Sequence, residues 1–185
     1  MSGDRKGSRT EPLDTGFERF VASASPALLR SAYLLTGDRG HAEDLVQSAL
    51  LRTLRRWRSI TGSPTSYAFS VLVNLSHDRG RAQRRRPVTA PARELPDRAA
   101  PDQLGRLLER AAITQAARRL PRSQREVLAC RFLLDLTVAE TAATLGLAEG
   151  TVKSYTSRAL DRMRELLADD ARASDGEPSE VRHAD

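Results

Sequence analysis

The residues best suited to chemistry in this sequence are arginines gathered in one short stretch. Residues 76–86, SHDRGRAQRRR, hold five arginines against one aspartate, a local net charge of +4. They cannot all pair within the chain, so they form either a solvated basic face or a site that neutralises phosphates. Asn74 precedes them on the outer side of the same expected helix, and asparagine hydrogen-bonds base edges. The candidate nucleic-acid contacts are Asn74, Arg79, Arg81, Arg84, Arg85 and Arg86.

A second candidate surface for nucleic acid lies in residues 137–167. Thr137 followed by Glu140 forms a capping-box pattern and predicts a helix start, and Gly146 predicts the end of that helix. A longer helix is expected from about residue 150 to residue 168. This order favours a helix-turn-helix, whose second helix enters the major groove of DNA. The alternative is an ordinary helical hairpin with a solvated charged face.

The sequence shows no arrangement of residues typical of catalysis. His41, His77 and His183 stand on different expected elements without metal-ligand spacing. No glycine-rich phosphate loop, zinc-protease motif or nucleophile elbow is found. Glu43 and Asp44 are adjacent on an expected helix, so their carboxylates point in different directions. We therefore expect no enzyme activity, no cofactor and no metal site.

The composition favours a polyanionic partner. The 185 residues carry a formal net charge of +6, and the sequence pI is about 10.3. Four Phe and one Trp suit small helical units better than one large core. Cys130 is the only cysteine, which excludes a disulfide framework and fits a reducing compartment. Without an apolar run that suits a membrane span or a signal peptide, we expect a soluble cytoplasmic protein with no membrane insertion.

The apolar spacing predicts an all-α chain, with two small helical bundles that position these surfaces. The segment between them holds four of the nine prolines and predicts a flexible linker. Both ends are polar, and the C-terminal end is net acidic, which predicts disorder. The expected organisation is a disordered N-terminus at 1–16, a first bundle at 17–86, a linker at 87–105, a second bundle at 106–168 and an acidic disordered tail at 169–185.

In the first bundle, one helix has an unusually regular apolar stripe that starts after a capping Asp38. At about 100° per residue, Leu51 falls opposite the stripe among polar side chains. It is either a scattered surface leucine or the centre of a docking surface. Pairs of serine and proline at 25–26 and 63–64 predict two further helix starts. The stripe consists of Ala42, Leu45, Val46, Ala49, Leu50, Thr53, Leu54 and Trp57.

The second bundle is expected to begin with two helices before the helix-turn-helix. The first starts near Leu107 and ends around Leu120. The next starts at Ser123, with Val127, Leu128 and Phe132 facing inward. Three arginines are left available on the outside: Arg122, Arg125 and Arg131.

Taken together, these stretches resemble the extracytoplasmic-function sigma factors of bacteria, the two-domain promoter-recognition subunits of RNA polymerase. AEDLVQSALLRTLRRW is similar to the helix that docks on the polymerase clamp, and SYAFSVLVNLSHDRGRAQRRR to the helix for the minus-ten element. The stretch from LPRSQREVL to LDRMREL resembles the domain that reads the minus-thirty-five element. The spellings LLRSAYLLTGD and GTVKSYTSRAL are most similar to an actinobacterial, sigma-E-like branch. The resemblance implies that residues 17–86 form sigma region 2 and that residues 106–168 form sigma region 4.

The resemblance implies a role for each candidate residue. The polymerase-docking motif comprises Asp44, Leu45, Gln47 and Leu51. Asn74 and the arginines from Arg79 to Arg86 fall where the family binds the minus-ten strand. The recognition helix carries Thr151, Lys153, Ser154, Ser157 and Arg158. Contacts with phosphates are expected from Arg122, Arg125 and Arg131.

Some positions depart from the family pattern. Phe69 and Ser70 stand where members often carry basic residues, which affects the upper part of the minus-ten surface. Ala148 replaces an expected Ser or Thr cap before the recognition helix, and loss of such a cap costs about 1 kcal/mol. Tyr155 replaces a frequent arginine, so a different DNA sequence is expected to be read.

The resemblance implies a dissociable promoter-specificity subunit. Its partners would be core RNA polymerase, through the clamp of the largest subunit, promoter DNA as duplex and melted strand, and an anti-sigma factor. Two alternatives remain at this point. One is a conventional helix-turn-helix regulator with an N-terminal sensing domain, and the other is an intracellular interaction module or an anti-regulator without a DNA role.

Overall fold

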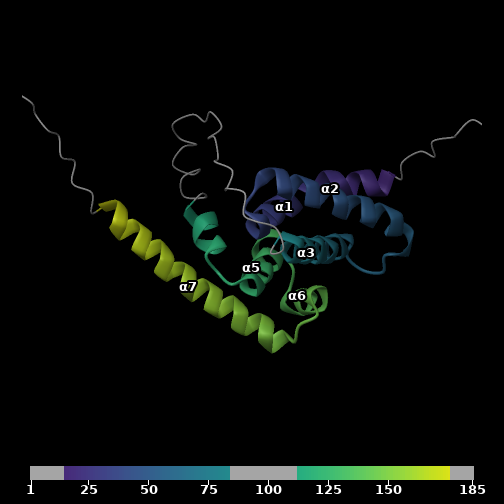
Figure 1. The fold of residues 1–185 in the computed structure, drawn as a ribbon. Helices are drawn as coiled ribbons and strands as arrows, with labels where there is room; N and C mark the ends of the chain where they lie inside the picture. Colours follow the sequence, from purple (N-terminus) through teal and green to yellow (C-terminus); the bar gives the residue numbers. More distant parts are fainter. Residues whose placement is uncertain (1–14, 84–111, 176–185) are drawn as a thin grey trace, which may run out of the picture.

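The structure, a computed structural model, describes residues 15–83 and 112–175, and within these ranges every regular element is helical (Figure 1). This confirms the all-α prediction. No helix in these two ranges is long and apolar enough to cross a membrane. The first group of helices comprises α1 (Thr15–Thr36), α2 (Arg39–Arg56), the short 3-10 turn η1 (Trp57–Ser59) and α3 (Pro64–Gln83). The second comprises a helical stretch at 112–118, α5 (Arg122–Leu128), the π-helical η2 (Ala129–Leu133), α6 (Val138–Leu145) and α7 (Glu149–Asp175).

The apolar stripe of α2 is the seam that holds the first group together. Its members are buried or half-buried, as the spacing predicts. Trp57 at the end of α2 receives Phe17 and Phe20 from α1, each with ring centroids 5.2 Å from the indole. Asp38 caps α2, since its side chain accepts a hydrogen bond from the His41 backbone amide at 2.8 Å.

Helix α1 is continuous through Pro26, so the predicted helix start at Ser25 and Pro26 is wrong. The Ser25 hydroxyl donates back to the Val21 carbonyl at 2.6 Å instead of capping a new helix. An internal proline removes one backbone hydrogen bond and is normally unfavourable. Here the burial of one apolar face on both sides of the proline outweighs that cost; its members are Phe17, Phe20, Ala24 and Leu28.

The predicted helix-turn-helix is present in α6 and α7. Thr137 and Glu140 form the capping box with both reciprocal hydrogen bonds, and Gly146 ends α6 with a φ of 65°, a conformation that glycine adopts without strain. Helix α7 runs to Asp175, so the expectation of disorder from residue 169 is wrong for the stretch up to Asp175. In that last part, Arg172 and Asp169 form an ion pair at 3.1 Å, and Asp170 pairs with Arg119 at 3.0 Å.

The segment after α5 changes helical pitch. The Leu134 amide donates to the Ala129 carbonyl five residues earlier at 3.1 Å, the spacing of a π-helix. More residues per turn rotate the following side chains relative to an α-helix. Phe132, predicted to face inward, is therefore 54% exposed.

The two groups of helices share one apolar core. That core joins residues of α1, α2 and α3 to Leu128 and Ala129 of the second group and to Leu166 of α7. In Figure 1, α5 and α6 lie between α3 and α7. A smaller cluster of Val127, Ala142 and Val152 stabilises the helix-turn-helix itself. The expected linker lies outside the described residues, yet the groups it connects are packed together.

Candidate nucleic-acid and partner interfaces

The outward face of α2 presents three of the four expected docking residues. Asp44 and Gln47 are exposed, and Leu51 is 53% exposed although the other apolar residues of α2 are buried or half-buried. The spacing of three and four residues puts the three side chains on one face. Leu45, the fourth, is only 4% exposed and packs in the apolar core, so it supports the helix and does not present a contact surface.

Helix α3 carries the candidate minus-ten residues. Asn74 is exposed on its outer side. Arg79 and Arg81 fall within the helix, but their side chains lie outside the described part of the chain, as do Arg84, Arg85 and Arg86 altogether. Phe69 is fully buried between the helices, so this departure from the family pattern belongs to the core and not to the surface. The Ser70 hydroxyl donates to the Tyr67 carbonyl at 2.8 Å.

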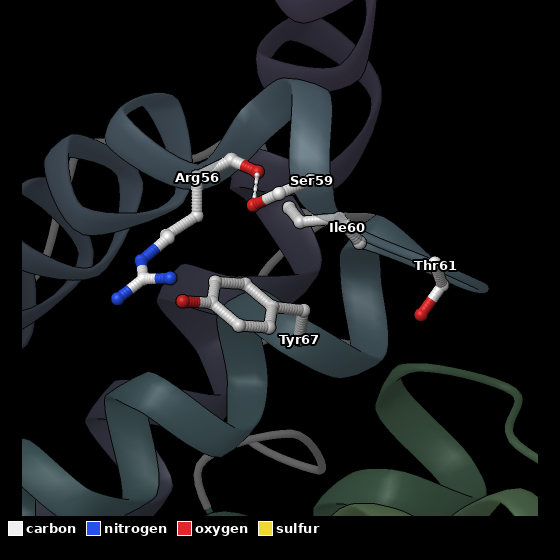
Figure 2. A pocket seen from close by; sticks show the side chains of 5 residues that line it. All are labelled: Arg56, Ser59, Ile60, Thr61 and Tyr67. Atoms are coloured by element: carbon white, nitrogen blue, oxygen red, sulfur yellow. Dashed lines mark hydrogen bonds between the residues drawn. The ribbon is translucent and has the colours of Figure 1, made fainter.

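A polar pocket of about 280 Å³ opens between η1 and the start of α3. Figure 2 shows the guanidinium of Arg56 and the hydroxyl end of Tyr67 pointing toward the same space. The Ser59 hydroxyl donates to the Arg56 carbonyl at 2.9 Å and fixes the turn. An aromatic ring beside a guanidinium suits a nucleotide base and its phosphate. No residue pattern in the sequence indicates this pocket, because a turn brings its residues together. They are Arg56, Ser59, Ile60, Thr61 and Tyr67.

The first turns of α7 present most of the expected recognition residues. Burial of Val152 and Ala159 fixes the rotation of the helix. That rotation leaves Lys153, Ser157 and Arg158 exposed and Thr151 and Ser154 half-buried. Tyr155 is half-buried against the Val127 cluster, so part of its ring is occupied in the helix-turn-helix. At Ala148, where a capping side chain is missing, the backbone carbonyl accepts from the amides of residues 151 and 152 at 2.9 and 3.1 Å.

The three arginines expected on phosphates are half-buried and turned toward protein groups. Arg122 donates to the Glu126 carboxylate at 3.0 Å and also to the Ser76 hydroxyl of α3. Arg125 donates to the Leu34 carbonyl of α1 at 3.4 Å. The third arginine, Arg131, donates to a carbonyl of its own loop, that of Leu136.

Arg122 and Arg125 lie near one buried carboxylate, that of Glu126. Glu126 is 8% exposed, and its oxygen lies 2.6 Å from Nε2 of His77 on α3. Burial, and after it the neighbouring cations of Arg122 and Arg118, lower the pKa of Arg125. Burial, reinforced by Glu126, raises the pKa of the Cys130 thiol to about 12.

An apolar cavity of about 280 Å³ lies between the two groups of helices. Ile113 and Phe132 border it and are 49% and 54% exposed. The Arg118 guanidinium lies 5.8 Å from the centroid of the Tyr33 ring, which also lines the cavity. The other lining residues are Arg30, Leu34, Thr114, Ala117, Leu128, Leu133, Leu160 and Met163.

Among the described residues, no three His, Cys, Asp or Glu side chains come together in a way that could hold a metal ion. His41 lies 3.6 Å from the Asp38 carboxylate and His77 contacts Glu126, so these two histidines occupy separate surroundings. His183 lies outside the described residues.

Comparison with known proteins agrees with this arrangement. Residues 20–86 match the family model for sigma-70 region 2, and residues 110–163 match that for sigma-70 region 4. An RNA polymerase sigma-E factor of Streptomyces avermitilis is 38% identical over 169 residues, which cover 89% of this chain and 93% of the relative. The ECF RNA polymerase sigma factor SigL of Mycobacterium tuberculosis is 36% identical over 160 residues, 76% of this chain and 90% of the relative.

Two solved structures share the fold. The sigma factor RpoE from Bartonella quintana, in complex with the anti-sigma factor NepR, aligns with a TM-score of 0.70 and 25% identity over 84% of this chain and 98% of that one. CnrH, in complex with the cytosolic domain of CnrY, aligns with a TM-score of 0.64 and 21% identity over 84% and 90%. The family models for region 2 and region 4 cover both groups of helices. This excludes a conventional helix-turn-helix regulator and an interaction module without a DNA role. The chain therefore belongs to the extracytoplasmic-function sigma factors, the sigma-70 subunits that direct RNA polymerase to promoters.

Proposed function

We propose that this sigma factor uses three separate surfaces: α2 for core polymerase, α3 with the η1 pocket for the melted minus-ten strand, and α7 for minus-thirty-five duplex DNA. The first group of helices would be region 2, from residue 17 to residue 86, and the second would be region 4, from residue 106 to residue 168. The observation that carries the proposal is the exposure of Leu51, at 53%, on a helix whose other apolar side chains are buried or half-buried. An isolated exposed leucine on the same helix face as exposed Asp44 and Gln47 suits a protein partner.

The docking surface is tested by Asp44→Lys combined with Leu51→Lys. Both side chains are exposed, so the fold is expected to persist while the apolar contact and the acidic charge are lost. Association with core polymerase, measured by pull-down or fluorescence anisotropy, should fall at least a hundredfold. Glu43→Lys is the matched control, because it makes the same acidic-to-basic change on the adjacent exposed residue, whose side chain points about 100° away. Unchanged association of the double variant would refute the docking assignment.

The minus-ten strand would be held by base stacking together with backbone neutralisation. Tyr67 offers a ring in the η1 pocket, Arg56 a cation, and Asn74 an amide further along α3. Loss of an aromatic stacking partner costs about 1–3 kcal/mol per base. Tyr67→Ala should therefore weaken open-complex formation by the holoenzyme about tenfold, and Tyr67→Phe should retain it. Equal loss in both variants would show that the ring is not the binding element.

Duplex DNA upstream would be read by the exposed start of α7. Lys153 and Arg158 are its cations, and Thr151, Ser154 and Ser157 its hydroxyls. In this role the chain positions polymerase and performs no catalysis of its own, as in its family of transcription initiation factors. It would act in the cytoplasm, with the polymerase.

An anti-sigma factor is a further proposed partner. The similar RpoE structure is a complex with such a factor. In this chain, an apolar cavity bordered by exposed Ile113 and Phe132 offers an apolar surface for such a partner. A two-hybrid screen with the wild-type chain as bait should return an inhibitor whose binding is lost with Phe132→Glu. A partner that binds both baits equally would place the contact elsewhere.

A further inference from the structure

Three arginines of the second group of helices, closely spaced along the sequence, contact the first group. They are spaced by four and three residues, at Arg118, Arg122 and Arg125. Arg118 lies over the Tyr33 ring, and a Cβ atom added to Gly37 would come within 2.1 Å of its guanidinium. The other two reach the Ser76 hydroxyl of α3 and the Leu34 carbonyl of α1. One side of the second group is thus held by cations.

The C-terminal end of α1 attracts two of these cations. The last four carbonyls of a helix lack partners within the helix, and that end carries a partial negative charge. Helix α1 has no basic residue in its own last turn. Arg125 donates to the carbonyl of Leu34, and Arg118 lies against the turn at Gly37. Both arginines therefore supply, from another part of the chain, the positive charge that usually follows a helix.

The contact between Arg122 and α3 is partly buried. Ser76 is 7% exposed and Glu126 is 8% exposed. Arg122 bridges these two residues, and Glu126 also contacts His77 at 2.6 Å. Loss of one partner between desolvated groups costs more than loss of an exposed ion pair, because the partner left alone stays uncompensated.

The contact of Arg125 with α1 is nevertheless weak. The Arg125 bond to the Leu34 carbonyl is long, at 3.4 Å, and the buried Nε of the same guanidinium has no hydrogen-bond partner among the described residues. A buried donor without a partner costs free energy. A phosphate, with several acceptor oxygens, would satisfy that guanidinium better than one carbonyl does.

The same arrangement conflicts with simultaneous promoter binding. At about 3.4 Å per base pair, elements centred near minus ten and minus thirty-five are separated by roughly 80 Å of duplex. Here Arg122 touches Ser76, one turn or less from Asn74 on the minus-ten helix, and α6 also packs against α3. The two groups must therefore separate before each can reach its element.

We propose that Arg118, Arg122 and Arg125 form an exchangeable latch. In the free protein they bind the end of α1 and the group formed by Ser76, His77 and Glu126, and so keep the DNA-binding surfaces together. On the promoter, DNA phosphates take over Arg122 and Arg125. The inference rests on the proposed function, and it adds that the same arginines serve closure and DNA binding in turn.

The first test measures closure in the free full-length protein. In a Cys130→Ala background, which removes a thiol that opening would uncover, spin labels on Arg52→Cys and Glu165→Cys, both exposed positions, report the distance between α2 and α7. The wild-type latch should give one narrow distance distribution, and Arg122→Ala with Arg125→Ala a longer and broader one. The control is Arg162→Ala with Arg164→Ala, which also removes two arginines but breaks only ion pairs within α7. Identical distributions for the latch variant and the wild type would overturn the proposal.

The second test separates closure from phosphate binding. Ser76→Ala with His77→Ala removes the α3 side of the latch and keeps all three arginines. Binding of a mixed-sequence duplex of about 20 base pairs by the free protein should then tighten several-fold. The slope of log affinity against log salt should steepen by about 2, because two arginines become available to phosphates. Arg122→Ala with Arg125→Ala should open the protein without this gain.

Controls keep the result interpretable. Helical content and thermal unfolding identify any variant that fails to fold, and Arg118→Gln, a change at an exposed side chain, then serves as the milder opening variant. An unchanged affinity and salt slope in the Ser76 and His77 variant would overturn the latch. Promoter-specific transcription with core polymerase, assayed separately on the wild type, tells that failure apart from failure of the sigma-factor assignment.

Discussion

The segment formed by α5 with η2 and the start of α7 both carry cations that the sequence assigns to DNA, but they place them in different surroundings. Arg122, Arg125 and Arg131 are half-buried and donate to protein groups. Lys153 and Arg158 are exposed on α7. Helix α5 lies between the first group of helices and α7, whereas the start of α7 packs on α6 and leaves one side open (Figure 1). Charge type alone therefore does not identify the partner of an arginine; its position in the packing does.

The largest expected difference between the two segments concerns their carboxylates. Glu126→Ala removes a buried partner of Arg122 and His77, which are themselves partly exposed, and should lower the free energy of unfolding by about 1–3 kcal/mol. Glu165→Ala removes the exposed partner of Arg162 on α7 and should cost less than about 1 kcal/mol. Denaturant unfolding of both variants measures the contrast. Similar values for the two would show that the α5 network is no stronger than a surface ion pair.

A smaller difference is expected in DNA reading. Arg158→Ala on α7 should cost the holoenzyme about 1–3 kcal/mol of discrimination at one promoter position, if the guanidinium reads a base edge. Arg131→Ala, which removes the same charge next to α5, should lower the unfolding temperature and leave promoter preference unchanged, because its guanidinium is bound to the Leu136 carbonyl. Transcription from a library of upstream sequences distinguishes them. A shift of preference in the Arg131 variant would move the DNA surface onto η2.

The smallest expected effect on stability concerns the N-terminal cap of α6, the helix on which the start of α7 packs. Hydrogen bonds from the Thr137 backbone and hydroxyl hold the pKa of Glu140 below its usual value. A lowered carboxyl pKa stabilises the fold above the pKa of the unfolded state, and this stabilisation disappears as the pH falls through the folded-state pKa. Thr137→Ala removes the hydroxyl from this cap and should therefore lower the free energy of unfolding at neutral pH. The difference from wild type should shrink once the pH falls below about 4. A difference independent of pH would show that the Thr137 hydroxyl does not stabilise the Glu140 carboxylate.

Local patterns in the sequence were sufficient for the elements whose structure is decided locally. The stripe of α2, the cap at Asp38 and the capping box at Thr137 depend on neighbours within a few residues, and all three predictions are confirmed. The predicted break at Pro26 is wrong because packing along the whole of α1 overrides a local signal. Phe132 is exposed because a π-helical turn, which no residue pattern announced, rotates it.

The candidate sites divide along the same line. The exposure of Leu51, Lys153 and Arg158 follows from helical spacing and could be predicted. The orientation of Arg122 and Arg125 could not, because it depends on groups at Ser76 and Leu34, far away in the sequence. The η1 pocket was also missed, since a short turn brings Arg56 and Tyr67 together. The roles assigned to these residues in binding DNA or polymerase stay predictions.

Transcription by purified core polymerase, with and without the full-length chain, on a library of promoter fragments tests the central claim most directly. We predict new start sites that depend on the chain, that are retained with Glu43→Lys and that are lost with Asp44→Lys and Leu51→Lys together. Transcripts that are the same with and without the chain, or a double variant as active as the wild type, would contradict the account.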